Sequence, residues 1–151
     1  MTTPIPPSTV ATIKGALFDL LSARMAGPGV LVAYDSPGTY QPEDIVCVGD
    51  VHRQIAVHAA VGSGGAGWLD ETYTVHVIVE CYRGGDNARL VFERAAALAA
   101  VAESAVRADP SIGGLALVAR PVGVDYTSDA EEDHKGRTTR ADLRIEVYAL
   151  T

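Results

Sequence analysis

Basic residues are scarce in this 151-residue chain. Twelve lysines and arginines stand against 19 aspartates and glutamates, which gives a formal net charge of −7 at neutral pH. A chain of this sign repels phosphate backbones and anionic membranes. We therefore do not expect specific nucleic-acid binding or membrane-surface binding.

Cysteine is nearly absent. Cys47 and Cys81 each sit in a strand-like run and form no C-x-x-C pair. This spacing argues against a disulfide scaffold and against a zinc ribbon, and it predicts two buried, reduced thiols.

Long apolar runs are also missing, and we expect no membrane span and no secretory leader. No stretch reaches the ~18 to 20 apolar residues of a membrane span, and the start "MTTPIPPSTVATIK" has no basic region followed by an apolar one. We expect a protein that is found in the cytosol where it is made. The 48% of hydrophobic residues suffices for one folded domain over residues 1–151, with residues 1–8 as an extended N-terminal arm.

The first element expected is a helix that starts at Ser8 or Thr9 and is stopped by "AGPG" at 26–29. Its apolar residues recur at helical spacing. They are Val10, Ile13, Leu17, Leu20, Leu21 and Met25.

A strand-rich region follows. Strands are predicted for "VLVAY" at 30–34, for "IVCVGDV" at 45–51 as a short strand interrupted by a glycine, and for "HRQIAVHAAV" at 52–61. The clearest β pattern is "ETYTVHVIVECY" at 71–82, which we expect to be a central strand. One face of it should carry Tyr73, Val75, Val77, Val79 and Cys81.

The second half predicts an alanine-rich helix and two strands. The helix starts at Asp86 and is ended by Asp109 and Pro110, with apolar positions at Leu90, Val91, Ala95, Leu98, Ala102 and Val106. The strands are 115–126, where Pro121 indicates a bulge or an edge, and 140–150, where Leu143, Ile145, Val147 and Ala149 alternate. A polar hairpin loop should join them over 127–139.

This order of elements predicts the fold class. Helices and strands do not alternate regularly, so we expect an α+β fold with a mostly antiparallel sheet and both helices packed on one face.

The glycines of "GSGGAG" at 62–67 match the spacing G-x-G-x-x-G. A dinucleotide site needs a helix after such a loop, and a P-loop needs a lysine and a hydroxyl. A strand pattern follows here, so we interpret Gly62, Gly64, Gly65 and Gly67 as the tip of a long β-hairpin.

Trp68 follows this glycine segment directly and is the only tryptophan. Two interpretations stand side by side. The ring covers the end of the core, or it is an aromatic anchor by which the hairpin contacts a partner.

No residue set in the sequence assembles an active site. His52 and His58 lie about 20 Å apart along a strand, too far to share a metal ion. The serine of "GSGG" lies in a hairpin loop and not in a nucleophile elbow. We expect no catalytic residues, no metal and no cofactor; an enzyme that uses His76 and the glycine loop on a small ligand is the distant alternative.

Acidic residues gather in the predicted loop before the last strand. Asp129, Glu131, Glu132 and Asp133 should be solvated. They are either a soluble tip or a surface that repels DNA or meets a basic partner.

The order of the segments resembles the tail terminator (tail completion) proteins of long-tailed bacteriophages. The resemblance runs from Thr9 to Leu150 and rests on "VGDV", "ETYTVHVIVECY", the helix that leads into "ADPSIGG", and "ADLRIEVYAL". The family usually has leucine where Ile112 stands.

The resemblance implies a fold, a function and partners. Such proteins have a small sheet flanked by helices, similar to that of tail tube proteins. They form hexameric rings that cap the tail tube, stop its elongation and dock to the head connector, and DNA passes through the ring. It implies for this chain a virion location at the head-proximal end of the tail. A connector or neck protein of the same virion is the alternative.

Overall fold

In the part of the chain that the structure describes, five strands form one sheet in the order β1-β2-β3-β5-β4, and two α-helices and a short 3-10 helix accompany it. The computed structural model describes residues 8–27, 29–39, 41–59 and 68–150; at 55–59, 68–70, 134 and 150 it describes the backbone alone. The elements are α1 (Val10–Met25), β1 (Val30–Tyr34), β2 (Asp44–Ala59), β3 (Trp68–Gly84), α2 (Ala88–Ala108), β4 (Val118–Ala130), the short 3-10 helix η1 (Glu132–His134) and β5 (Gly136–Leu150).

Neighbouring strands are antiparallel, except that β1 runs parallel to β2. The predicted α+β class with a mostly antiparallel sheet is confirmed. β3 lies in the middle of the sheet, between β2 and β5, as its pattern predicts. Its predicted inner face is buried without exception, because alternate side chains of a strand point to the same side.

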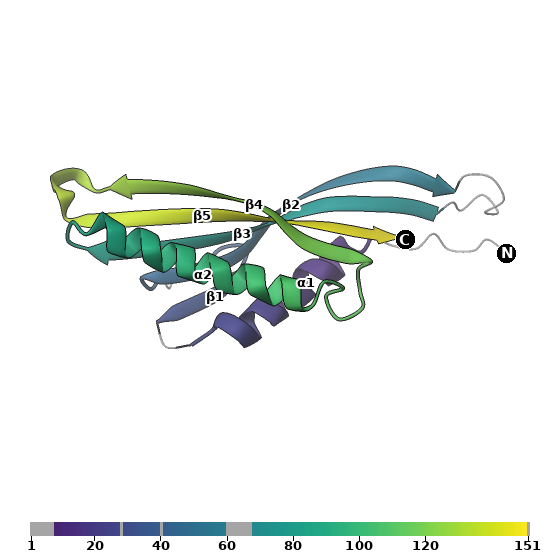
Figure 1. Ribbon diagram of the computed structural model, residues 1–151, viewed down its shortest axis with the longest axis horizontal. Helices are drawn as coiled ribbons and strands as arrows, with labels where there is room; N and C mark the ends of the chain where they lie inside the picture. Colours follow the sequence, from purple (N-terminus) through teal and green to yellow (C-terminus); the bar gives the residue numbers. More distant parts are fainter. Residues whose placement is uncertain (1–7, 28, 40, 60–67, 151) are drawn as a thin grey trace.

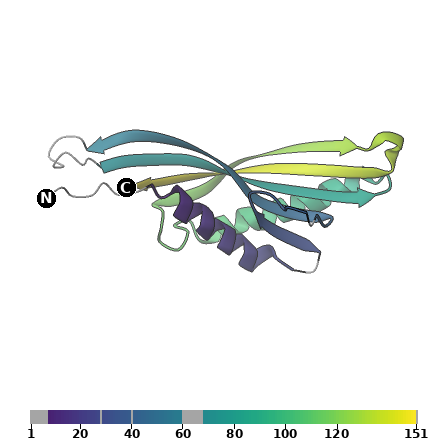
Figure 2. The ribbon, with the colours of Figure 1, turned by 180° about the vertical axis from the view of Figure 1, so that it is seen from behind.

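Both helices cover the same face of the sheet, as predicted. Figures 1 and 2 show them side by side under the strands, with α2 nearer the viewer in the first view and α1 in the second. Ile13 and Leu17 of α1, Ala95 and Ala102 of α2, and Leu143 of β5 belong to one buried cluster. The opposite face of the sheet carries no helix among the described residues.

The predicted hairpin between the last two strands is present, but the predicted bounds of its loop, 127–139, are too wide. β4 runs to Ala130 and β5 begins at Gly136, so both strands extend into the polar segment. Ser128 and Thr139 are cross-strand partners with their hydroxyl oxygens 3.2 Å apart, and Thr139 is buried. Polar residues therefore continue the ladder, because threonine pairs well across strands.

The predicted strand 45–51 and its continuation from His52 form one strand, β2, over Asp44–Ala59; residues 60 and 61 lie outside the described residues. Gly49 and Asp50 form a β-bulge between the paired residues Val48 and Val51. A bulge absorbs an extra residue and bends the strand without ending it. Pro121 was predicted to lie at a bulge or on an edge strand, and both are confirmed: β4 is an edge strand, and its register with β5 shifts between Pro121 and Gly123.

The helix starts differ in detail from the prediction. Thr9 is the N-cap of α1, but its hydroxyl does not cap the helix; it bonds instead to the carboxylate of Glu71. Asn87 caps α2 through the amide of Leu90. Leu90, predicted on the buried face, is 53% exposed.

A buried carboxylate lies at each end of the helix-covered face and links neighbouring elements by hydrogen bonds. Glu71 accepts hydrogen bonds from the Ser8 hydroxyl (2.6 Å), from the Thr9 amide (2.9 Å) and from Arg53. It thereby joins the start of α1 to β3. Its side chain is fully buried.

Asp44 fills the same role at the other end. Arg83 donates to both of its oxygens at 2.7 and 3.0 Å, and Arg94 of α2 donates at 3.0 Å. This bidentate pair with a second arginine joins β2, β3 and α2.

Both cysteines are buried and free, as predicted. Burial raises the pKa of Cys47, and nearby Glu80 adds to the rise. Burial and the neighbouring Asp44 raise the pKa of Cys81 to about 12. Both thiols are therefore neutral and poorly nucleophilic. No helix in the described part of the chain is long and apolar enough to cross a membrane.

Candidate assembly surface

β4 is an edge strand whose outer side is open except near its start, where the Ala119 amide donates to the Pro110 carbonyl at 2.6 Å and Pro121 has no N–H. β4 pairs only with β5, and within the described residues no strand pairs with its other side. Such an edge exposes unpaired backbone N–H and C=O groups, which another strand can bind.

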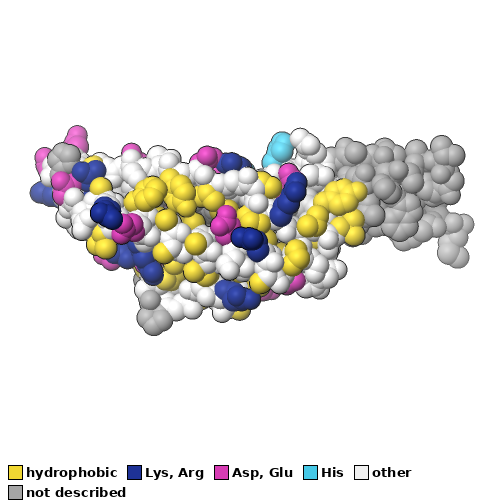
Figure 3. All heavy atoms as spheres, in the orientation of Figure 1, with side chains coloured by type: hydrophobic (Ala, Val, Ile, Leu, Met, Phe, Trp, Pro, Cys, Tyr) yellow, Lys and Arg dark blue, Asp and Glu magenta, His cyan; other side chains and the backbone are white. Residues whose placement is uncertain are grey.

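Apolar side chains are exposed along this edge and on the neighbouring helix. Figure 3 shows hydrophobic side chains gathered over the region of β4 and α2. Exposed fractions range from 40% to 56%. The set comprises Phe92, Leu115, Leu117, Val118, Val122 and Tyr126.

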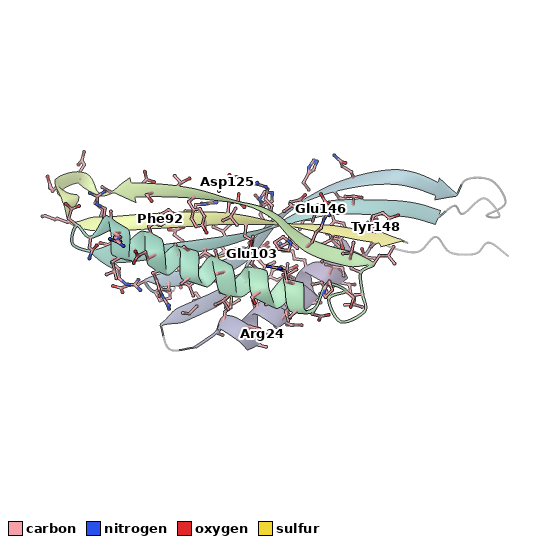
Figure 4. The ribbon with its side chains drawn as sticks, viewed as in Figure 1. Arg24, Phe92, Glu103, Asp125, Glu146 and Tyr148 are labelled. Atoms are coloured by element: carbon pink, nitrogen blue, oxygen red, sulfur yellow. The ribbon has the colours of Figure 1, made fainter. Side chains whose placement is uncertain are left out.

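Two aromatic rings join β4 to α2 on the helix-covered side. The ring centroids of Phe92 and Tyr126 are 5.0 Å apart, in a tilted arrangement. Figure 4 shows Phe92 projecting from α2 toward β4. Both rings stay partly exposed, so they present an apolar contact area and not a filled core.

A second edge is open on the other side of the sheet. β1 pairs only with Asp44–Val48 of β2. From Val51 to Ala59, β2 has a partner on one side only among the described residues, namely β3. We call this segment, Val51–Ala59, the open half of β2.

The face without helices is polar, and its charges are largely paired. His76 Nδ1 lies 2.8 Å from Asp142, Arg120 bonds Glu146 at 3.1 Å, and Arg144 pairs with Asp125. Asp125 and Glu146 are labelled in Figure 4, on β4 and β5. Exposed pairs of this kind contribute little to stability.

Two shallow depressions lie on this face. One of about 250 Å³ is lined by His76, Asp142 and Arg140 among others, and one of about 400 Å³ by Glu43, Glu80 and Tyr82 among others. Among the described residues no three His, Cys, Asp or Glu side chains are placed to hold a metal ion.

The structure describes only part of the contact residues predicted from the sequence. Gly62, Gly64, Gly65 and Gly67 lie outside the described residues. β2 and β3, which flank them, pair up to Ala59 and Trp68, so a strand and not a helix follows the glycines. This confirms the hairpin and removes the dinucleotide-loop alternative. Trp68 is the first residue of β3.

The predicted acidic residues lie together at the far end, at the turn between β4 and β5. Asp129 is in β4, Glu131 precedes η1, and Glu132 and Asp133 are in η1; all four are exposed. Glu131 hydrogen-bonds Tyr82 and thereby raises the pKa of that phenol.

Sequence reasoning missed the apolar edge. The signals were weak: Leu115, Leu117 and Val118 break strict alternation, and Leu90 and Phe92 lie off the buried stripe of their helix. Which side of a strand stays unpaired depends on the sheet order, and that order is a long-range property.

Comparisons with known proteins give a distant likeness. No family model matches this chain, and no curated protein matches it. Among solved structures, one similar chain comes from a "Virion of native gene transfer agent (GTA) particle". It is 16% identical, the alignment covers 95% of this chain and 100% of that chain, and the TM-score is 0.39. A likeness this distant decides nothing about function.

Proposed function

We propose that this chain is a non-enzymatic structural protein of a tailed-phage virion. In this proposal it forms a ring, expected to be a hexamer, that caps the tail tube, stops its elongation and provides the docking surface for the head connector. The structural observation that supports it best is a sheet with two open edges and exposed apolar side chains along one of them. The sequence resemblance to tail terminators supplies the specific role.

The buried ionisable groups support a mechanical role. Glu71 and Asp44 have their oxygens occupied by structural hydrogen bonds, and the described residues contain no buried side-chain polar atom without a partner. Catalytic groups are commonly placed in clefts with reactive partners left available. Here the polar groups hold elements together, so the surfaces are the means of action.

A ring requires two different patches on each subunit. Each copy must offer one surface to the copy before it and another to the copy after it. Open edges on opposite sides of one sheet meet this requirement. The paired ends of β2 and β3 at Ala59 and Trp68 and the turn between β4 and β5 lie at opposite ends of the sheet (Figure 1), so we propose that one end contacts the tube protein and the other the connector. The candidate contacts at the first end are Gly62, Gly64, Gly65, Gly67 and Trp68.

The acidic end is the proposed channel-facing or partner-facing element. Replacing Glu131, Glu132 and Asp133 by lysine should leave the melting temperature nearly unchanged, because all three are exposed. If they line the channel, the lysines bind passing phosphates and slow DNA ejection. The measurement is the ejection rate of variant phage, with the triple glutamine variant as the control that removes charge without reversing it. An ejection rate equal to that of the parent places these residues on the outside.

Deletion of the gene tests the proposed role. Tails assembled without this protein should be longer than normal and carry no heads, because tube subunits continue to add. Negative-stain electron microscopy measures tail length, and expression of the intact gene from a plasmid is the control. Tails of normal length without heads would instead indicate the connector or neck role. Normal, infectious particles would refute both.

A further inference from the structure

Each edge of the sheet has a stretch that no described strand covers. On β2 it is the open half, whose regular pairing with β3 runs to Val57. On β4 it is Gly123–Ala130, which follows the β-bulge and the start of the strand, where Ala119 and Pro121 obstruct the edge. We call Gly123–Ala130 the open half of β4. Figure 1 shows the two open halves toward opposite ends of the sheet.

The backbone groups that point outward on β2 follow from its hydrogen bonds. The Val48 carbonyl accepts from the Asp35 amide at 2.9 Å on the side of β1, so the backbone groups of Val48 point outward. Val48 pairs with Val77 of β3. Val51 pairs with Val75, two residues away on the same strand. Because the direction alternates along a strand, Val51 and every second residue after it also point outward.

The same reasoning applies to β4. The Ala119 amide donates to the Pro110 carbonyl outside the sheet, so the backbone groups of Ala119 point outward. Ala119 pairs with Val147 of β5. Val124 pairs with Leu143, four residues away on the same strand. Val124 and every second residue after it therefore point outward as well.

On both edges the outward groups belong to residues on the helix-covered face. Val48 is in the buried cluster beneath the helices, and Val51 and Val124 pack against that cluster. In a sheet that continued from one copy to the next with all helices on one side, outward groups would therefore meet outward groups. β2 and β4 run in opposite directions, because each pair from β2 through β3 and β5 to β4 is antiparallel. The joined edges would form an antiparallel ladder.

We propose that the open half of β4 of one copy pairs with the open half of β2 of the next copy, as Val124–Ala130 against Val51–Val57. The inference rests on the proposed function only in that the chain assembles with copies of itself. Each copy uses one edge for each neighbour, so the contact is heterologous. Ala130 stands opposite Val51, past the last residue that β1 covers, Val48, and the turn after Ala130 leads toward β5. β1 therefore leaves this register free.

The residues that stand opposite each other in this register match in character. Two apolar pairs lie on the helix-covered face; a carboxylate–imidazole pair and an uncharged polar pair lie on the other face. They are Tyr126 with Ile55, Val124 with Val57, Asp129 with His52, and Thr127 with Gln54. Tyr126 is 40% exposed within one copy, so the pairing covers an apolar ring that otherwise faces solvent.

The neighbouring registers are less favourable. A shift by two residues in one direction sets the hydroxyl residue Ser128 opposite Ile55. The shift in the other direction brings Ala130 to the level of Val48, where β1 already pairs. The register with Thr127 opposite Gln54 avoids both conflicts.

This register offsets neighbouring copies along the strands. Within one copy Gln54 is level with Val118, through the pairs of Gln54 with Thr72, Thr72 with Tyr148, and Tyr148 with Val118. At the junction Gln54 meets Thr127, which gives an offset of about 26 Å once the β-bulge is taken into account. A sheet of five strands is about 24 Å wide, so the strands of a closed ring would incline by roughly 48°, slightly more than in typical β-barrels.

Cysteine cross-linking tests the junction. The variants are Gln54→Cys with Thr127→Cys, and His52→Cys with Asp129→Cys; all four sites are exposed. Both would be non-hydrogen-bonded pairs, whose Cα atoms lie about 4.5 Å apart, a distance that permits a disulfide. Within one copy the two sites of each pair are roughly 30 Å apart, too far for a disulfide. The native cysteines are buried. After mild oxidation of the full-length protein, with and without tail tubes, we expect a reducible ladder of covalent oligomers from both pairs.

Controls separate this junction from others. Each single variant should stay uncross-linked. Gln54→Cys with Val118→Cys should as well, since Val118 is about 26 Å from Thr127 along β4; a ladder from this pair would show a different register and overturn the proposal. A dimer from Thr127→Cys alone means two-fold β4 pairing and also overturns it, as does the absence of a ladder from both test pairs. Overlong tails on gene deletion together with no ladder would leave the proposed function standing and refute this junction alone.

Discussion

Replacing Glu71 by glutamine is expected to lower the free energy of unfolding by about 3 kcal/mol. The carboxylate is fully buried and binds Ser8, Thr9 and Arg53, so an amide loses the ion pair and turns an NH2 group toward donors. The side chain of Arg53 is 31% exposed, so water can solvate its charge once the carboxylate is gone. The expected loss of unfolding free energy is therefore at the lower end of the range for a broken buried ion pair. Urea unfolding at pH 7 measures it. Glu80→Gln, on the same strand but exposed, is the control and should change stability little.

The pH dependence of this effect has a definite sign. Burial alone would raise the pKa of Glu71, but the hydrogen bonds from Ser8, Thr9 and Arg53 outweigh it and lower that pKa below the ordinary 4.5. A carboxyl whose pKa is lower in the folded state stabilises the protein fully above the ordinary pKa, and it loses this contribution as the pH falls through the folded-state pKa. The gap between the parent and Glu71→Gln should therefore be constant near neutrality and shrink in acid below about pH 4.5. A gap that widened in acid would contradict the assignment.

Replacing Asp44 by alanine should cost about 3 kcal/mol as well. The change leaves Arg83 and Arg94 without their shared anion on a partly buried surface, where their exposures are 26% and 41%. Burial would raise the pKa of Asp44, and the two arginines lower it below its usual value, so the ionised form is the one that stabilises. Thermal unfolding by circular dichroism measures the loss.

The matched control for Asp44 is Glu93→Ala. Glu93 pairs with Arg89 one helical turn away, and both side chains are well exposed. The Glu93→Ala variant should therefore lose less than about 0.5 kcal/mol of unfolding free energy. Equal losses for Asp44→Ala and Glu93→Ala would show that the Asp44 cluster adds no more than a surface pair. Because Asp44 joins two strands and a helix, we expect the unfolding transition to remain cooperative but to shift as a whole.

Much of the fold was readable from local patterns. The alternation at Tyr73–Cys81 and Leu143–Ala149 predicted two buried strand faces, and the spacing from Ile13 to Met25 predicted a helix; all are confirmed. These patterns succeed because periods of 2 and 3.6 residues reflect burial on one side. The strand extensions at Ser128 and Thr139 were missed, since polar residues that pair across strands look like loop residues in one dimension.

Most of the candidate assembly surface could not be predicted from the sequence, because it depends on the order and register of strands that lie far apart in the chain. Pro121 did predict an edge or a bulge, which placed β4 at the rim of the sheet. That β1 covers only the first part of β2, and that the uncovered part is level with Val118–Val122, follows from register across four strands. The partners of Glu71 lie 18 to 63 residues away, beyond the reach of any local pattern. The glycine segment and Trp68 remain predicted contacts.

The position of β5 has a consequence for how the protein is made. The strand nearest the C-terminus lies inside the sheet, between β3 and β4, and its partners in β3 are 52 to 80 residues earlier (Gly84 with Gly136, Asp70 with Leu150). While the chain is emerging from the ribosome, the backbone N–H and C=O groups on one side of β3 therefore remain unpaired, and β4 has no neighbouring strand. Pairing across such separations is slow. The nascent protein accordingly exposes aggregation-prone edges until Leu150 has been synthesised, which favours slow production at low temperature.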